Sequence, residues 1–186
     1  MCGILGYIGN QKKTVDVLLQ GLSRLEYRGY DSSGIAIIQN GKSKVFKSKG
    51  KLSKLKTKIN KHSPKGSLGI GHTRWATHGD ASQKNAHPHI SGGTSVVHNG
   101  IIENYDALKK ELLARGYTFK SDTDTEVLVN LVEHISKKEN VWYGEALRLA
   151  LFHVVGAYAI VATSKNHPNQ MVAARKSSPL VIGIGA

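Results

Sequence analysis

The chain has a single cysteine, Cys2, which directly follows Met1 in the opening stretch MCGILGYIG. An initiator methionine is generally removed before a small second residue, and its removal would give Cys2 a free α-amine. That amine has a reference pKa of about 7.7–8.0, so it could accept the thiol proton, as in amino-terminal threonine nucleophiles. Position alone therefore indicates either an amino-terminal nucleophile or a small buried apolar residue.

Acyl transfer from an amide also needs donors for an oxyanion and groups that hold the substrate. Asn99 and Gly100 could supply a side-chain amide and a backbone N–H, although an isolated Asn-Gly usually marks a tight turn. Arg74 could bind a carboxylate through two hydrogen bonds, or it could be an ordinary surface arginine. Asp124 could pair with an ammonium group, although the run 123–126 also fits a helix capping box.

The elements that must position these residues follow from the apolar pattern. It predicts helices over 14–25, 104–115 and 146–155, one that buries Leu52, Leu55 and Ile59, and one after the capping box. Short apolar runs predict strands at 3–9, 67–73, 94–100, 157–163, 171–175 and 179–185. Asn40-Gly41 predicts a hairpin with a type I′ turn. This mixture favours an α+β fold, with antiparallel sheets covered by helices.

Composition narrows the class of protein. The chain has 186 residues and a net charge of +13, concentrated between Lys42 and Lys65. Phe46 is the one Phe, Tyr or Trp in that run, whereas RNA binding usually needs interleaved aromatic side chains, so a solvated arm is favoured. A single cysteine excludes an intrachain disulfide, and no apolar run is long enough for a membrane helix. We therefore expect a cytoplasmic protein that binds neither nucleic acid nor membrane.

The nine histidines raise the question of a metal site, above all His87, His89 and His98. Metal sites usually combine histidines with cysteine or carboxylate ligands at set spacings, and the chain has neither HExxH nor a second cysteine. No Walker-type phosphate loop is present either. We expect no metal and no cofactor.

Six stretches together resemble a known family. In chain order they are MCGILGYIG, LEYRGYDSSGIAI, GHTRWATHG, NAHPH, VVHNGIIENY and SDTDTE. They resemble the glutaminase domain of class II glutamine amidotransferases, and within that class the glutamine–fructose-6-phosphate aminotransferase family. Amidophosphoribosyltransferases are similar at several of these stretches, but they usually have Tyr-Ser-Thr after the arginine, where this chain has Trp75-Ala76-Thr77-His78.

The resemblance implies a fold and an activity. The fold is that of the amino-terminal-nucleophile hydrolases, a four-layer αββα sandwich of antiparallel sheets. The activity is hydrolysis of L-glutamine to glutamate and ammonia. The ammonia would serve the conversion of fructose 6-phosphate to glucosamine 6-phosphate on a sugar isomerase domain.

The resemblance also implies roles for single residues. Cys2 resembles the nucleophile that forms a thioester with glutamine, and Asn99 and Gly100 resemble the oxyanion hole. Arg74 is similar to the residue that binds the substrate α-carboxylate. Asp124 is similar to the partner of the α-ammonium group.

The stretch 74–82 resembles a mobile loop that closes over bound glutamine. Within it Trp75 resembles the residue that gates the passage of ammonia, with ordinary packing as the alternative, and Thr77 and His78 resemble pocket-lining residues. Arg28 and His87 match family positions near the site and are expected to support it.

Relatives in the family continue beyond the segment that matches SPLVIGIGA. Residues 1–186 are therefore expected to be a truncated glutaminase domain without the isomerase domain, and a late sheet is expected to lack strands. Full-length relatives are expected to be homo-oligomers. A remnant that binds glutamine or a protein partner without turnover is the alternative function, and a form that keeps Met1 is expected to be inactive.

Overall fold

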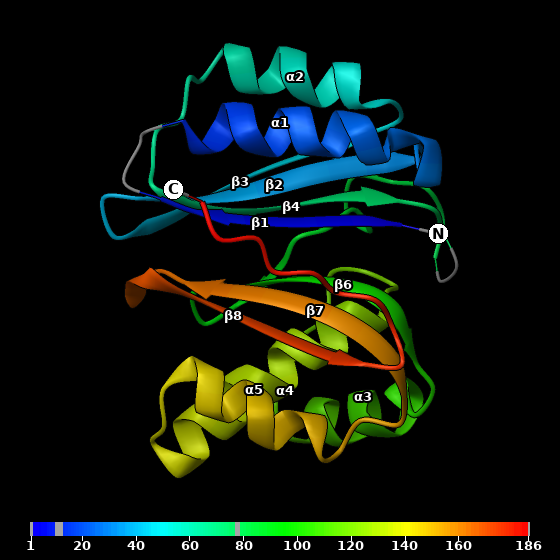
Figure 1. The fold of residues 1–186 in the computed structure, drawn as a ribbon. Coiled ribbons are helices and arrows are strands. Elements are labelled where there is room, and N and C mark those ends of the chain that lie inside the picture. The colour runs from blue at the N-terminus through cyan, green and yellow to red at the C-terminus, as the bar shows by residue number, and fades with distance from the viewer. Residues whose placement is uncertain (1, 10–12, 77–78, 186) are drawn as a thin grey trace.

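The computed structural model describes residues 2–9, 13–76 and 79–185. Its elements stack in four layers, with helices, a sheet, a second sheet and helices in that order (Figure 1). Both sheets are antiparallel and four-stranded. The predicted α+β class and the four-layer sandwich are confirmed.

The first sheet has the strand order β1-β4-β2-β3. Its strands are β1 (Gly3–Ile8), β2 (Ser32–Gln39), β3 (Lys42–Lys49) and β4 (Leu68–Arg74). Asn40 and Gly41 join β2 to β3 with φ angles of 49° and 68°. Both are positive, as a type I′ turn requires, so the predicted hairpin is confirmed.

Two helices cover the outer face of this sheet, α1 (Thr14–Leu25) and α2 (Leu52–Asn60), as Figure 1 shows. The short 3₁₀ helix η1 (Glu26–Arg28) follows α1. Leu52, Leu55 and Ile59 are buried, as their spacing predicts. They form one apolar core with residues of α1, β2 and β3, so the lysine-rich helix α2 is held by its apolar face.

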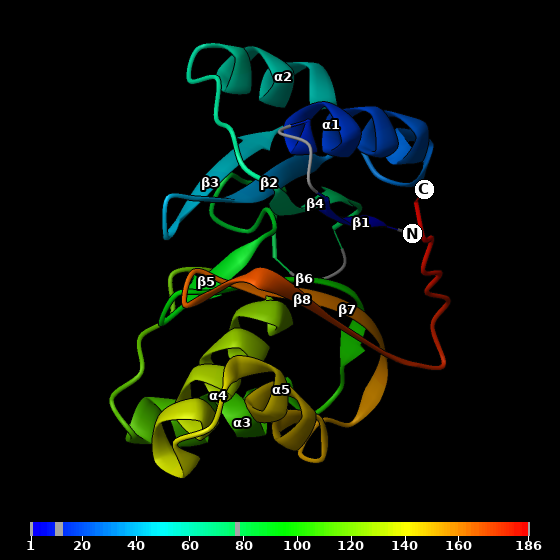
Figure 2. The same cartoon turned by 60° about the vertical axis from the view of Figure 1, so that its left-hand side comes forward.

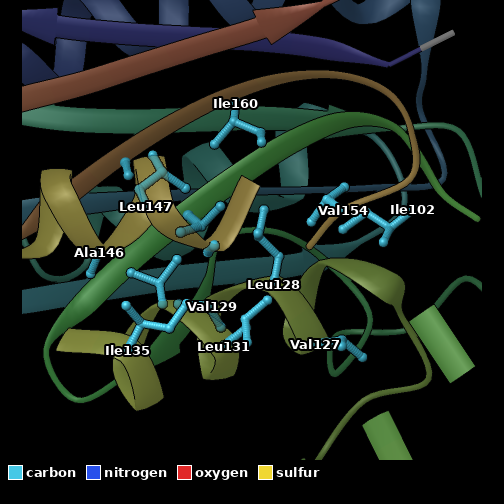
Figure 3. Close-up of a cluster of buried hydrophobic side chains, with 14 of the residues drawn as sticks. Ile102, Val127, Leu128, Val129, Leu131, Ile135, Ala146, Leu147, Val154 and Ile160 are labelled. Carbon is cyan, nitrogen blue, oxygen red and sulfur yellow. The ribbon is translucent and has the colours of Figure 1, made fainter. Parts of the chain in front are cut away.

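The second sheet has the order β5-β6-β7-β8. Its strands are β5 (His89–Ser91), β6 (Thr94–Ile102), β7 (Gly156–Ser164) and β8 (His167–Lys176). Its outer face is covered by α3 (Tyr105–Ala114), α4 (Asp124–Glu139) and α5 (Tyr143–Leu151), which a second view shows beneath the sheet (Figure 2). Figure 3 shows the core between them, in which Leu128, Leu147 and Ile160 point toward one another.

The space between the two sheets differs from these cores. One small apolar cluster joins the sheets there, built on Ala36, Ile70, Val97 and Val161. The rest of this inner layer is rich in buried polar side chains, and four of them are histidines: His72, His87, His89 and His98. Buried polar side chains need hydrogen-bond partners, and these partners fix their orientation. The inner layer therefore holds polar side chains in defined positions.

Two predicted elements differ from the structure. Residues 179–185 do not form a strand, and Val181, Ile182 and Ile184 are 90%, 80% and 97% exposed. A strand forms by pairing, and among the described residues the pairing ends with a bridge from Ser177 to Tyr158, just before this segment. Helix α5 spans Tyr143–Leu151 rather than 146–155, and residues 152–155 connect it to β7, which begins at Gly156. No helix in the described part of the chain is both long and apolar enough to cross a membrane.

Candidate active site

A cavity of about 550 Å³ lies between the two sheets, where β1 and α4 begin and β4 ends. Every predicted site residue that the structure describes lines it: Cys2, Arg28, Arg74, Trp75, His87, Asn99, Gly100 and Asp124. Thr77 and His78 lie outside the described residues. Predicted site residues as far apart in the sequence as Cys2 and Asp124 thus share one cavity.

Cys2 directly precedes β1, and the pairing of Gly3 with Thr73 places it beside the end of β4. The backbone N–H of Trp75 donates a hydrogen bond to Cys2 Sγ at 3.2 Å. Burial raises the pKa of the Cys2 thiol, and the N–H of Trp75 lowers it in part, with a net rise. At neutral pH the thiol therefore keeps its proton, and a base must remove it before sulfur can act as a nucleophile.

Asn99 and Gly100 lie within strand β6, so the tight-turn alternative for this pair is wrong. Asn99 Nδ2 donates to the carbonyl oxygen of Cys2 at 3.1 Å, which holds the amide next to the cysteine. Gly100 has a φ of 134°, and a Cβ there would lie 2.0 Å from the carbonyl oxygen of Ala157. The pairing of β6 with β7 therefore requires glycine at this position.

Arg74 is the last residue of β4 and only 3% exposed, so it is not an ordinary surface arginine. Its guanidinium donates to the carbonyl oxygens of Gly79 at 3.0 Å and Asp80 at 3.2 Å. Gly79 has a φ of 74°, and a Cβ there would lie 2.6 Å from the Asn85 amide nitrogen. The glycine thus permits a tight loop around the guanidinium.

Asp31, for which the sequence predicts no role, anchors the start of the same loop. Its N–H donates to the carbonyl oxygen of Arg74 at 3.2 Å, and its Oδ2 accepts the N–H of Ala76. Its Oδ1 lies 4.0 Å from the Arg74 guanidinium. The sequence did offer a signal for Asp31, because this residue belongs to LEYRGYDSSGIAI, one of the stretches that resemble the family.

Asp124 is the first residue of α4 and 6% exposed. Its Oδ2 accepts the backbone N–H of Ile102 at 2.9 Å, which ties the start of α4 to the end of β6. The predicted capping box is wrong: Thr123 makes no side-chain cap, and the Glu126 carboxylate instead accepts the N–H groups of Lys120 and Ser121. The acid at 124 is therefore not explained by helix capping.

Two of the four inner-layer histidines, His87 and His98, line the cavity, and His72 contacts both of them. His87 Nε2 lies 2.8 Å from Thr125 Oγ1, and the His87 ring stacks on that of His72 with centroids 4.1 Å apart. His98 Nδ1 lies 2.9 Å from Thr125 Oγ1 and 4.0 Å from Asp124 Oδ2. Burial lowers the pKa of His72 to about 3 and that of His87 well below its usual value, so both rings are neutral.

His72 and His98 had no predicted role, and no apolar periodicity marks either of them. The described residues contain no cluster of three or more histidine, cysteine or acidic side chains that could hold a metal ion. The hydrogen bonds and ring contacts of these histidines connect the site to its surroundings.

Trp75 and Arg28 lie at the rim of the cavity. The Trp75 side chain is 49% exposed and meets the Tyr30 ring edge-on, with centroids 5.7 Å apart. Arg28 ends η1, and a Cβ on the next residue, Gly29, would lie 2.6 Å from the Arg74 carbonyl carbon. The turn after η1 thus packs directly on the end of β4, which brings Arg28 to the cavity.

The chain is similar to known proteins. The model of a family described as a glutamine amidotransferase domain matches residues 72–184. The glutamine–fructose-6-phosphate aminotransferases [isomerizing] of Bacteroides thetaiotaomicron and Caldanaerobacter subterraneus are each 54% identical over 100% of this chain and 30% of their own length. A structure of glutamine phosphoribosylpyrophosphate amidotransferase from B. subtilis superposes with a TM-score of 0.76, at 25% identity over 89% of this chain and 35% of that one. The chain thus spans about 30% of the curated relatives it matches.

Proposed function

The chain belongs to the glutamine amidotransferase domain family, and on that premise we propose that it hydrolyses L-glutamine to glutamate and ammonia with Cys2 as the nucleophile. The observation that carries the proposal is the shared cavity, which joins a thiol, an amide N–H donor, a buried guanidinium and a buried carboxylate. A zwitterionic amino acid with a side-chain amide matches these groups in charge and in hydrogen bonding.

Substrate binding uses the two charged groups. Arg74 would bind the α-carboxylate and Asp124 the α-ammonium, so the γ-carboxamide extends toward Cys2. The carboxylate of Asp124 is already oriented by the Ile102 N–H, and the Arg74 guanidinium by the loop carbonyls. Both ions are therefore pre-positioned, which lowers the entropic cost of binding. Amides that lack an amino-acid end would leave a buried charge without a partner and bind poorly.

The first chemical step transfers the thiol proton of Cys2 to the α-amine that removal of Met1 exposes. Sulfur attacks the carboxamide carbon, and the carbonyl π electrons move to oxygen as an oxyanion. Asn99 Nδ2 carries two hydrogens, of which one is donated to the Cys2 carbonyl and the other can meet the oxyanion beside the Gly100 N–H. Collapse of the oxyanion breaks the C–N bond, and the ammonium form of the α-amine protonates the leaving nitrogen.

The resulting thioester is hydrolysed with the same groups, and water takes the place of the thiol as the nucleophile. Water attacks the thioester carbon while the neutral α-amine takes its proton, and the same donors meet the second oxyanion. The C–S bond then breaks, glutamate leaves and the thiol recovers its proton. The 74–82 stretch would shield the thioester from bulk water until ammonia has left. Support comes from the side chains of Arg74 and Asn85, which both donate to the carbonyl oxygen of Asp80.

We further propose that the ammonia serves a synthase domain that makes glucosamine 6-phosphate from fructose 6-phosphate. Support comes from the relatives' names and from identity that is higher to them than to the phosphoribosylpyrophosphate amidotransferase. Residues 1–186 would then be the glutaminase domain of such an enzyme, and Trp75 would gate ammonia, a role supported by its contact with the cavity.

The experiment that tests the nucleophile uses a glutamine analogue with a chloromethyl ketone in place of the carboxamide, from whose methylene carbon the thiolate displaces chloride. We expect one equivalent to alkylate Cys2 Sγ, as mapped by peptide mass spectrometry, and excess glutamine to slow the reaction. Arg74→Ala should slow labelling without changing its site. Alkylation at another residue, or no protection by glutamine, would contradict the proposal. Protection without any turnover would support the alternative of a glutamine-binding domain.

A further inference from the structure

His72 lies in β4 with its side chain fully buried in the inner layer. Its Nε2 is 2.9 Å from Asn99 Oδ1 and 3.1 Å from the carbonyl oxygen of His98. Both of these oxygens are acceptors only, so Nε2 must carry the imidazole hydrogen and donate it. The contacts thus fix the tautomer of His72.

The same contact fixes the orientation of the Asn99 carboxamide. With Oδ1 held by His72, the amide nitrogen faces Cys2 and donates to its carbonyl oxygen at 3.1 Å. A flipped amide would set Nδ2 against the Nε2–H of His72 and Oδ1 against the Cys2 carbonyl. Two donors and two acceptors would then face one another, which a buried site does not tolerate.

The surroundings keep the His72 ring in place and neutral. The His87 ring stacks on it at 4.1 Å with an interplanar angle of 23°, and His87 is itself held by Thr125 at 2.8 Å. Burial, together with the nearby His98 and Arg74, lowers the pKa of His72. The hydrogen bond to Asn99 Oδ1 is therefore donated by a neutral imidazole. The other ring nitrogen of His72, Nδ1, has no hydrogen-bond partner among the described residues.

We infer that His72 is a positioning residue that sets the aim of the Asn99 amide at the oxyanion through its Nε2–H···Oδ1 hydrogen bond. The inference rests on the proposed function and adds to it a residue that does not itself touch the substrate. Loss of an oxyanion donor lowers kcat about 10²–10³-fold. Loss of its aim should lower kcat less, by about 10- to 100-fold, and leave KM for glutamine nearly unchanged.

The test compares His72→Gln with His72→Asn. The Gln side chain can place an amide N–H close to the position of Nε2, whereas the shorter Asn reaches only the position of Nδ1. We expect His72→Gln to keep most of the wild-type kcat and His72→Asn to lose about 10- to 100-fold, with KM changed less than about threefold in both. His89→Gln is the matched control, since His89 is buried in the same layer but hydrogen-bonds Thr123 rather than Asn99.

A result in which His72→Gln and His72→Asn are equally impaired, or in which only KM changes, would overturn the inference. Wild-type protein that releases no glutamate would instead contradict the proposed function. The inference is then decided by nuclear magnetic resonance of [¹⁵N]Asn-labelled protein, which needs no turnover. The Asn99 side-chain resonance should stay near its wild-type position in His72→Gln and shift in His72→Asn, and an unshifted resonance in both would refute it.

Discussion

A Cβ at Gly100 would lie 2.0 Å from the carbonyl oxygen of Ala157, the residue before its cross-strand partner Tyr158. The same glycine has a φ of 134°, which side chains with a Cβ rarely adopt. Gly100 is thus required both by the pairing of β6 with β7 and by the backbone that would face the oxyanion. Fold and chemistry depend on one position.

Gly100→Ala is therefore expected to destabilise the protein by about 2–4 kcal/mol, from backbone strain together with the clash. Gly116→Ala is the matched control, because Gly116 has a φ of 85° but a Cβ there meets nothing within 4 Å. It should cost only about 1 kcal/mol. Urea unfolding measures both, and equal losses in the two variants would show that the contact with Ala157 is not the cause.

Asp124→Asn removes the charge proposed to meet the substrate ammonium. Hydrogen bonds to charged groups contribute about 1.5–3 kcal/mol, so KM for glutamine should rise about 10- to 100-fold with a smaller change in kcat. Selectivity for glutamine over an analogue without the α-amine should fall as well. Steady-state kinetics with both substrates checks this.

The control for that variant is Asp106→Asn, an exposed acid in the first turn of α3. It should leave KM unchanged. An Asp124→Asn protein with wild-type KM and undiminished selectivity would show that Asp124 serves only to hold β6 against α4 through Ile102.

The pH dependence of kcat/KM follows from the two groups at Cys2. Burial holds the pKa of the thiol above its usual value, so the thiol stays protonated near neutral pH. The α-amine must be neutral to accept that proton, and its reference pKa is about 7.7–8.0. Below that pKa the amine is protonated, so kcat/KM should fall about tenfold per pH unit. A rate that first rises above about pH 9 would assign the dependence to the thiol instead.

Removal of Met1 should be required for activity, because a peptide bond at the nitrogen of Cys2 abolishes the base. A chain that retains one residue ahead of Cys2, so that the Cys2 nitrogen stays in a peptide bond, should release glutamate at least 10²-fold more slowly than the processed chain. Mass spectrometry confirms which residue begins each chain, and the processed chain that begins at Cys2, purified in the same way, is the control. Equal turnover would require another base in the cavity.

Much of the fold could be predicted from the sequence, because local patterns determine it. The Asn40-Gly41 hairpin follows from turn chemistry, and the burial of Leu52, Leu55 and Ile59 follows from helical spacing. The segment 179–185 has the composition of a strand yet remains irregular. Strand formation depends on a partner strand, which composition does not reveal.

The predicted site residues lie in the six sequence stretches that resemble the family, so these residues could be predicted from the sequence. Residue identity did not reveal that the Glu126 carboxylate accepts an N–H of the preceding loop and that Thr123 makes no side-chain cap. The sequence 123–126 is compatible with either arrangement. The role of His72 depends on how β4 faces β6 across the two sheets, a relationship that no local pattern contains. Contacts between sheets were therefore accessible only from the structure.

The central claim is that Cys2, with its freed α-amine, attacks glutamine in this cavity. The most direct measurement is glutamate release from glutamine by the processed chain beside a Cys2→Ala variant, with matched folding shown by circular dichroism. The account predicts release by the processed chain and none above background by Cys2→Ala. Undiminished release by Cys2→Ala, or no release by a folded, processed chain that binds glutamine, would contradict it.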